Sequence, residues 1–278
     1  MYQDLVSVIM PSYNAGKKIA DSIQSVLSQT YQNLELLITD DASTDVFTQL
    51  IIKDFAQKDK RLKVHFLDQN RGTGYARNEA IKRAQGRFIA FCDSDDRWTI
   101  DKLQVQLNFM QEKNCAICCS TYIICDSNND EIGINIPPQI ITYNMLKRDN
   151  KIGCLTAMYD THKLGKKFYM PAIRKRQDWA LLLQIMKESH VCYAYTLKPL
   201  AYYCKRKNSI SSNKISLIKY NLAVYHQILG YSLLKSYFYF FLLFLPTYTL
   251  KIIKRKYNSL YIIRCAPTIL QKTSSRKC

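Results

Sequence analysis

Acidic residues are missing from the last part of this 278-residue chain. From Lys198 to Cys278 there are fifteen Lys or Arg and no Asp or Glu, so this segment carries most of the formal net charge of +18. Such asymmetry points to a polyanionic partner, either nucleic acid or an anionic membrane surface. The hydrophobic content of 47% is ordinary for a globular protein.

Glycine is also scarce, with 8 residues in the whole chain. The first apolar run is followed by residues 11–14 (PSYN) rather than by a glycine-rich phosphate loop. The segment 72–74 (GTG) lacks the third glycine of a dinucleotide fingerprint, because Arg77 stands in its place. The sequence therefore argues against a Rossmann dehydrogenase and against an enzyme with a lysine-bearing phosphate loop.

No secretory leader pattern precedes the first apolar run, and the ten cysteines fit small core residues of a reducing cytosol better than a disulfide scaffold. The CxxCC of Cys115, Cys118 and Cys119 could be half of a zinc site. No second CxxC or His pair follows at ligand spacing, so zinc is not expected.

Four apolar runs alternate with helical patterns in the first hundred residues. They are Val6–Met10, Leu34–Thr39, Leu62–Leu67 and Phe88–Cys92. Alternation of this kind predicts parallel strands in a three-layer α/β fold. We expect one catalytic domain over residues 1–210, with a nucleotide-binding half at 1–115 and an acceptor half at 116–210, followed by a basic, aromatic-rich helical tail at 211–278.

Three carboxylates, Asp93, Asp95 and Asp96, follow the fourth apolar run directly. Like charges this close repel one another, and a hard divalent cation such as Mg²⁺ or Mn²⁺ would offset the repulsion. The carboxyl ends of strands in open α/β sheets are also where ligands bind. The alternative is an acidic turn that only ends the strand.

Three other segments carry candidate residues with structural alternatives. The carboxylates of residues 40–45 (DDASTD) could accept hydrogen bonds from a ligand or cap the next helix. Arg77 could bind a phosphate or pair with the acidic turn. Asp178, among basic residues, could be a general base or the cap of a helix that begins at Trp179.

Together these segments resemble the family 2 glycosyltransferases of the GT-A fold, closely over residues 5–107 and more loosely to 183. The resemblance lies in Val6–Asn14, Ser25–Tyr31, Asp40–Asp45, Asn70–Gly72 with Ala76–Asn78, and Asp93–Asp96, in the family's order and at similar intervals. It implies the GT-A nucleotide-diphospho-sugar transferase fold, with a mostly parallel central sheet flanked by helices.

The resemblance also implies roles for individual residues. The nucleotide-sugar would be held by Pro11, Tyr13, Asn14, Asp41, Arg77, Asp93 and Ser94. Asp95 would ligate Mn²⁺ or Mg²⁺, and Asp178, in a segment similar to the family's (E/Q)DW motif, would be the catalytic base. The departure is Arg176, in an unusually basic loop. Glu188 is the next carboxylate to consider.

The implied function is inverting, metal-dependent transfer of a sugar, expected from UDP, to a glycan or lipid-linked acceptor in bacterial surface polysaccharide synthesis. Two alternatives stay open: a nucleotidyltransferase, and a catalytically inert, membrane-associated sugar-binding module.

An uncharged, aromatic block, Ser236–Leu250, lies within the basic tail. With fifteen residues and an internal Pro246 it is shorter than the roughly 20 residues that span a bilayer. Flanking cations favour a segment lying in an anionic membrane interface, and a core helix is the alternative. We expect a cytoplasmic protein, peripheral on the inner face of the cell membrane, that does not bind nucleic acid.

Overall fold

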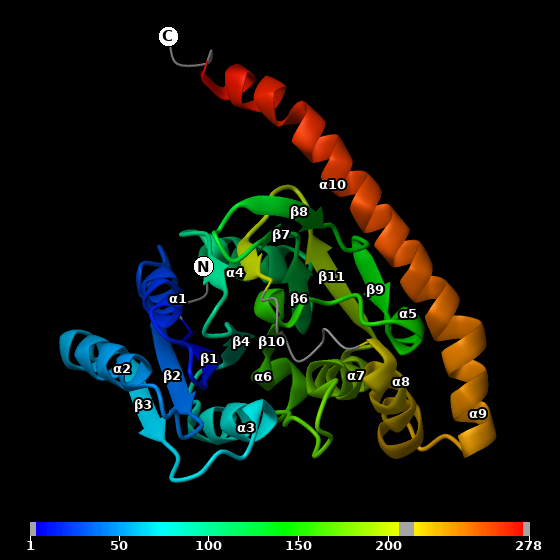
Figure 1. The fold of residues 1–278 in the computed structure, drawn as a ribbon, viewed down its shortest axis with the longest axis horizontal. Helices are drawn as coiled ribbons and strands as arrows, with labels where there is room; N and C mark the ends of the chain where they lie inside the picture. The colour runs from blue at the N-terminus through cyan, green and yellow to red at the C-terminus, as the bar shows by residue number, and fades with distance from the viewer. Residues whose placement is uncertain (1–3, 206–213, 275–278) are drawn as a thin grey trace.

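A computed structural model describes residues 4–205 and 214–274, the latter with backbone only for 214–217 and 260–274 (Figure 1). Its centre is an eight-stranded sheet of order β3-β2-β1-β4-β10-β6-β11-β9. A smaller sheet has the order β5-β12-β7-β8. Helices cover both faces of the large sheet, which confirms the predicted α/β class (Figure 1).

The first half of the chain is the predicted alternation of parallel strands and helices. Its elements are β1 (Val6–Ser12), α1 (Lys18–Leu27), β2 (Leu34–Asp40), α2 (Val46–Lys58), β3 (Leu62–Phe66), α3 (Thr73–Arg83) and β4 (Phe88–Phe91). β1 pairs in parallel with both β2 and β4, and β2 with β3. The four predicted strand positions agree with these strands.

Strands β1, β2 and β4 have every residue buried, as expected for parallel strands covered on both faces. Successive side chains enter opposite layers. Ile9 packs with α3 and α7 (Gln177–Ser189), whereas its neighbours Val8 and Met10 pack with α1 and α4 (Lys102–Glu112). Two hydrophobic layers therefore sandwich the sheet.

The second half departs from a purely parallel arrangement. β10 (Met158–Asp160) runs antiparallel between β4 and β6 (Ile117–Ser120), β11 (Val191–Tyr195) is parallel to β6, and β9 (Ile140–Thr142) is antiparallel to β11. The large sheet is thus parallel in the nucleotide half and mixed beyond it. Antiparallel β10 is the strand that joins the two halves.

The smaller sheet grows out of the larger one. Its strands are β5 (Arg97–Trp98), β7 (Tyr122–Cys125), β8 (Glu131–Asn135) and β12 (Ala201–Cys204). Only Thr121 separates β6 from β7, and its backbone amide donates to Tyr195 while its carbonyl accepts from Leu200. The parallel pair β6–β11 therefore continues as the parallel pair β7–β12 across one seam.

The remaining described elements are helical. They are α5 (Tyr143–Arg148), η1 (Cys154–Thr156), α6 (Thr161–Leu164), α8 (Lys214–Ala223), η2 (Val224–Ile228), α9 (Leu233–Phe238), η3 (Tyr239–Phe244) and α10 (Leu245–Ser274), with η2 and η3 in π-helical geometry. The helical tail that the sequence predicts is therefore present.

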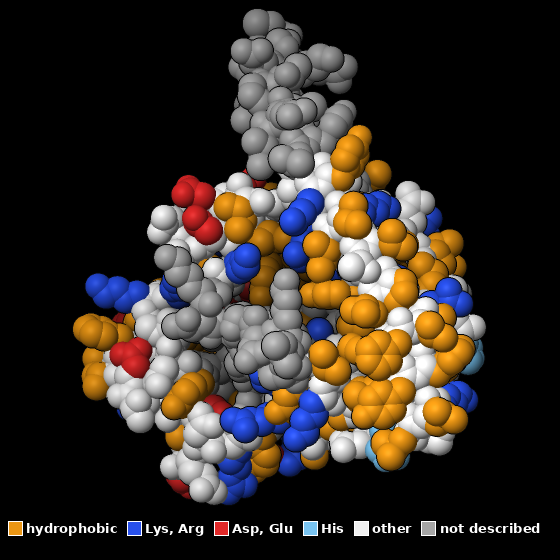
Figure 2. All heavy atoms as spheres, turned by 45° about the vertical axis from the view of Figure 1, so that its right-hand side comes forward, with side chains coloured by type: hydrophobic (Ala, Val, Ile, Leu, Met, Phe, Trp, Pro, Cys, Tyr) orange, Lys and Arg blue, Asp and Glu red, His pale blue; other side chains and the backbone are white. Residues whose placement is uncertain are grey.

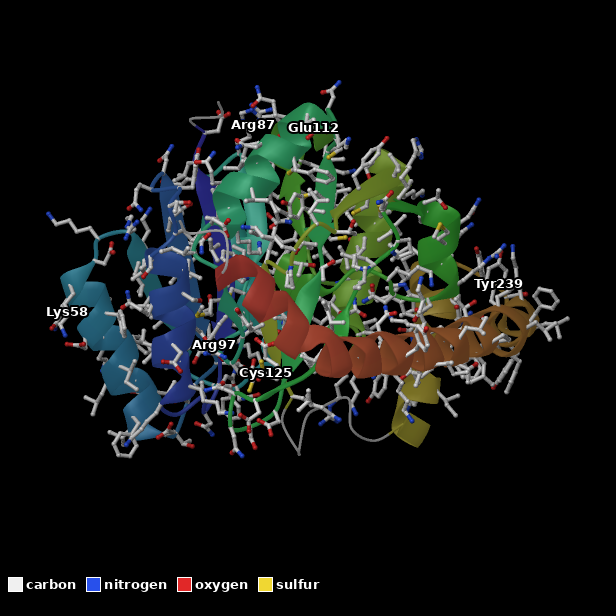
Figure 3. All side chains as sticks on the ribbon, turned by 90° about the horizontal axis from the view of Figure 1, so that it is seen from above. Lys58, Arg87, Arg97, Glu112, Cys125 and Tyr239 are labelled. Carbon is white, nitrogen blue, oxygen red and sulfur yellow. The ribbon has the colours of Figure 1, made fainter. Side chains whose placement is uncertain are left out.

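One face of the tail packs against α7 and β8 of the preceding domain. Phe240 and Phe244 are 3% and 4% exposed, and the rings of Phe244 and Tyr225 lie 5.6 and 5.7 Å from that of Trp179. α10 extends from the Tyr239 end along one side of the molecule and packs against β8 (Figure 3). The boundary at residue 210 remains a prediction, since the tail shares a core with the domain before it.

Candidate active site

The acidic turn, Asp93–Asp96, follows β4 in the middle of the large sheet. The turn is closed by a hydrogen bond of 3.0 Å from the amide of Asp96 to the carbonyl of Asp93. Asp93 and Asp95 are half-buried, and Ser94 is 8% exposed. The structure therefore places these candidates at the carboxyl end of a central strand, where open α/β sheets bind ligands.

Asp96 is buried under the turn and is 2% exposed. Burial, and then the negative charges of Asp95 and Asp93, raise the pKa of Asp96 well above its usual value. The amide of Cys204 on β12 donates to its Oδ1 at 3.0 Å and acts in the opposite direction. The carboxylates of the turn therefore repel one another.

Arg77 is the cation that reaches the turn. Its Nη2 lies 2.5 Å from Asp93 Oδ1; the Arg77 side chain is 8% exposed and that of Asp93 is 34% exposed, so a buried cation pairs here with a half-buried carboxylate. Burial acts to lower the pKa of Arg77, but Asp93 and, more weakly, Asp178 raise it above its usual value. The Nε atom of Arg77 is buried with no hydrogen-bond partner.

The loops after β1 and β2 are joined to each other. Asn14 Oδ1 accepts from the amides of Thr44 and Asp45 at 2.9 and 3.0 Å, and its own amide donates to Ser43 Oγ at 2.8 Å. Asn14 has a positive φ of 46°, which asparagine tolerates. Asp45 caps α2 through the amide of Phe47. Capping therefore belongs to Asp45, and Asn14 holds the two loops together.

Asp41 directly follows β2 and is 2% exposed. Its two carboxylate oxygens accept from the amides of Arg71 and Gly72 at 2.7 and 2.8 Å. These bonds fix the loop before α3 against β2. Pro11 is buried at the end of β1, whereas Tyr13 is 46% exposed beside it. The residues predicted to contact the nucleobase therefore lie at the ends of β1 and β2 and in the connected loops that follow these strands.

Asp178 lies in the first turn of α7. That helix begins at Gln177, and its N-cap, Arg176, makes no side-chain capping bond. The Oδ2 of Asp178 instead accepts from the side-chain amide of Asn150 at 3.2 Å. The alternative of a cap for a helix beginning at Trp179 is therefore wrong.

Glu188 cannot replace Asp178. It lies near the other end of α7, about 15 Å away at 1.5 Å of rise per residue. Its carboxylate pairs with Lys166 at 3.2 Å on the surface.

Tyr203 on β12 is coupled electrostatically to four carboxylates. Burial, and then the charges of Asp96, Asp95, Asp93 and Asp178, raise the pKa of Tyr203 to about 12. The phenol therefore lies within electrostatic reach of all four. Sequence reasoning missed both Tyr203 and Asn150, because neither lies in a recognisable motif and only the fold brings them to Asp178.

A divalent cation fits this donor set when a substrate completes its shell. Among the residues that the structure describes, no group of three or more His, Cys, Asp or Glu could hold a metal by itself. Mg²⁺ and Mn²⁺ commonly take one or two carboxylates and complete their shell with substrate phosphates and water. The repulsion among the carboxylates, which adds to burial in raising the pKa of Asp96, is the feature that such a cation would reduce.

Two cavities lie outside this cluster. One of about 280 Å³ lies at the end of β3 and is lined by His65, Phe66, Leu67, Asp68, Gln69, Arg71 and Tyr75. The larger, about 360 Å³, is lined by residues of α4, β11 and the segments beside β9 and β11, and none of them belongs to the acidic turn or to α7. The candidate site is therefore identified by its side chains, because neither of these cavities coincides with it.

Two bacterial glycosyltransferases are similar to this chain in sequence. The chain is 42% identical over 228 residues to the putative teichuronic acid biosynthesis glycosyltransferase TuaG of Bacillus subtilis, covering 82% of this chain and 89% of that protein. It is also 42% identical over 215 residues to the Escherichia coli UDP-Glc:alpha-D-GlcNAc-diphosphoundecaprenol beta-1,3-glucosyltransferase WfgD, covering 77% and 83%.

A solved structure agrees with the fold. Staphylococcus aureus TarS 1–349 in complex with UDP-GlcNAc superposes with a TM-score of 0.66 at 23% identity, over 83% of this chain and 69% of that one. The model of glycosyl transferase family 2 matches residues 7–167, which begin in β1 and run past the acidic turn to the loop before α7. The chain is therefore a glycosyltransferase and belongs to glycosyl transferase family 2.

Proposed function

We propose that this enzyme transfers a sugar from a UDP-sugar to a lipid-diphosphate-linked glycan in bacterial surface polysaccharide synthesis, with inversion at the anomeric carbon. The observation that carries the proposal is the group of four carboxylates around Tyr203, with Arg77 as the buried cation among them. The relatives named for teichuronic acid and for a diphosphoundecaprenol acceptor support the substrate class.

The loops after β1 and β2 would hold the nucleotide. Asp41 retains acceptor capacity beyond its two backbone bonds, since a carboxylate offers about four lone-pair sites. Pro11, Tyr13 and Asn14 would border the base, with the exposed Tyr13 ring free of the core. Asp93 and Ser94 would reach the ribose and Arg77 the diphosphate.

Asp95 would ligate Mn²⁺ or Mg²⁺ together with the donor diphosphate. When bound, such a cation supplies Lewis-acid stabilisation of the departing diphosphate. Arg77 contributes a permanent positive charge on the same side, because Asp93 and Asp178 keep it protonated.

Asp178 would take the proton from the acceptor hydroxyl as the acceptor oxygen attacks the sugar's anomeric carbon. The bond from that carbon to the diphosphate oxygen breaks as the new glycosidic bond forms, and its electron pair leaves with UDP. One ionised carboxylate suffices for this step, because attack opposite the leaving group needs no covalent enzyme intermediate.

The tail would place the enzyme on the cytoplasmic face of the membrane. Figure 2, in which the α9–α10 side comes forward, shows a broad hydrophobic patch with Lys and Arg side chains around it. Its exposed members, which we call the outer face, are Leu233, Leu234, Tyr237, Phe238, Phe241, Leu242, Leu245, Leu250, Ile253 and Tyr257. An apolar face with nearby cations suits an anionic interface, where a lipid-linked acceptor resides.

The helical stretch Leu233–Ser259 is long and apolar enough to cross a membrane by length and composition. The apolar segment expected from the sequence was shorter, because only the uncharged residues Ser236–Leu250 were counted, whereas the helix continues through Lys251. We propose that this helical stretch lies in the membrane interface and does not cross the bilayer. Its opposite face contacts the preceding domain through Phe240, Phe244 and Lys251.

The metal assignment is tested by Asp95→Ala. We expect calorimetry to show Mn²⁺-dependent UDP binding for the parent and its loss in the folded variant, because Asp95 is the proposed link between metal and diphosphate. Unchanged UDP affinity and metal dependence would remove Asp95 from this role.

The base assignment is tested by Asp178→Asn, with Glu188→Gln as the control on the same helix. We expect Asp178→Asn to keep UDP affinity and to lower kcat by roughly 10²–10⁴, as for loss of a general base. Glu188→Gln should turn over normally. Near-normal turnover of Asp178→Asn with a diphosphate-linked acceptor would contradict the assignment of the base. If the parent hydrolyses the UDP-sugar without transferring the sugar to that acceptor, the proposed acceptor class is wrong.

A further inference from the structure

The tail helix reaches the loop beside Asp178 through Lys251. Its Nζ lies 3.0 Å from Asp149 Oδ2 and also donates to the backbone carbonyl of Asn150. The Asp149 side chain is 3% exposed, so its charge must be matched within the protein. Lys151 is farther from it, at 3.7 Å. Of these two cations Lys251 lies nearer to Asp149, and it connects α10 to this loop.

Asn150 presents a definite hydrogen-bond donor to Asp178. Its side-chain oxygen accepts from the amide of Ile152 at 3.2 Å, and its side-chain nitrogen donates to Asp178 Oδ2 at 3.2 Å. Because the oxygen is already engaged by a donor, the amino group is the end that faces the carboxylate. The contact is thus oriented by the loop itself.

The helix before this loop is held on two sides. Trp179 Nε1 donates to the carbonyl of Leu146 at 2.9 Å, and the Tyr225 hydroxyl donates to the carbonyl of Lys147 at 2.9 Å. Trp179 adjoins Asp178, whereas Tyr225 belongs to η2 of the tail. The segment from α5 to Ile152 therefore connects the tail to the start of α7.

We propose that Asn150 is a positioning residue for Asp178, and that the contacts of Lys251 with Asp149 and Asn150 hold it in place. The inference rests on the proposed role of Asp178 as the base. The Asn150 amide donates to Oδ2 of Asp178 and so fixes which carboxylate oxygen remains for the acceptor proton. The same helix carries the outer face, so the seating of the tail determines the geometry of the base.

Three groups near Asp178 keep one protonation state over the range of the test, roughly pH 5 to 9. Arg77 keeps its proton, and burial raises the pKa of the Cys154 thiol far above its usual value and that of Tyr203 to about 12. Burial also raises the pKa of Asp96 and lowers that of Lys251. Both of these groups are present in the parent and in Asn150→Ala, so a difference between those two proteins does not come from the removal of either.

The first test is the pH profile of kcat for Asn150→Ala on the full chain with a soluble diphosphate-linked acceptor. The variant removes a hydrogen bond to the charged form of the proposed base, so the acid limb of the profile should move to higher pH. We expect kcat at neutral pH to fall about tenfold to a hundredfold with the donor KM unchanged, and Asn150→Gln to restore part of it. An unmoved acid limb would overturn the positioning role, even if turnover fell.

The second test compares Lys251→Ala with Lys254→Ala, one turn along the same helix. Both remove one positive charge from the tail, but Lys254 is exposed. Only Lys251→Ala should shift the acid limb, and Lys251→Arg should preserve it. Equal profiles for the two alanine variants would overturn the link to the tail.

Failure of the inference and failure of the proposed base are distinguishable. An active Asp178→Asn variant would refute the base itself. An inactive Asp178→Asn with an unshifted Asn150→Ala profile would refute only the positioning role.

Discussion

Phe240 and Phe241 are neighbours in the tail with opposite surroundings, and exchanging each for alanine separates folding from membrane binding. Phe240 is 3% exposed and its ring stacks on that of Phe244 at 5.5 Å, whereas Phe241 is 53% exposed on the outer face. If the tail is a layer of the catalytic fold, Phe240→Ala should destabilise the whole protein. If the tail is a separate anchor, it should not.

The expected size follows from burial. Truncating a buried Phe to Ala costs about 3–5 kcal/mol, a large share of a typical stability of about 5–15 kcal/mol. For a chain of this size each kcal/mol moves Tm by roughly 2–4 °C. We therefore expect Phe240→Ala to lower Tm by about 10 °C, and Phe241→Ala to change the free energy of unfolding by less than about 0.5 kcal/mol.

Vesicle binding should show the reverse order. A half-exposed Phe that becomes buried in the interface contributes about 1–2 kcal/mol, so Phe241→Ala should weaken binding to anionic liposomes by about tenfold. Scanning calorimetry and liposome flotation give the two readouts. Unchanged thermal stability of Phe240→Ala, or equal losses in both assays for the two variants, would refute the packing of the tail.

Two further predictions concern side chains near the site. Gly74→Ala should leave UDP affinity normal and change kcat little, because an added Cβ would lie 2.3 Å from the end of the flexible Gln177 side chain, which can turn aside; a large loss of turnover in a steady-state assay would contradict this. Burial lowers the pKa of Lys102 to about 8, so the folded protein loses this proton before the unfolded chain does, and the contribution to stability rises between about pH 8 and pH 10.5. Lys102→Met should abolish that rise, worth about 3 kcal/mol in chemical denaturation, and an identical pH dependence in both proteins would show that Lys102 is not buried as a cation.

The nucleotide half could be predicted from the sequence because its signals are local. Buried parallel strands appear as continuous apolar runs, and the acidic turn ends one of them, so Asp93 and Asp95 were found together with their place in the sheet. The pairing of Arg77 with Asp93 was one of two readings, and the structure contains this pair.

The acceptor half could not be predicted as well, because its contacts are long-range. β5 has only two residues, and β6 and β7 are separated by Thr121 alone, so no turn signal marks their boundary in the sequence. Asn150 lies 28 residues from Asp178 in an unremarkable polar segment. The uncharged block was identified correctly as a helix, but its division into an inner and an outer face depends on which elements it meets.

The seam at Thr121 has a consequence for how the molecule unfolds. The parallel pair β6–β11 lies on one side of it and the parallel pair β7–β12 on the other, and Cys204 at the end of β12 donates to Asp96. The two hydrogen bonds of Thr121 with Tyr195 and Leu200 therefore join the smaller sheet to the larger one at this point. The two halves of the catalytic domain should melt in a single cooperative transition, and amides along the seam should exchange with solvent only as fast as the whole domain opens.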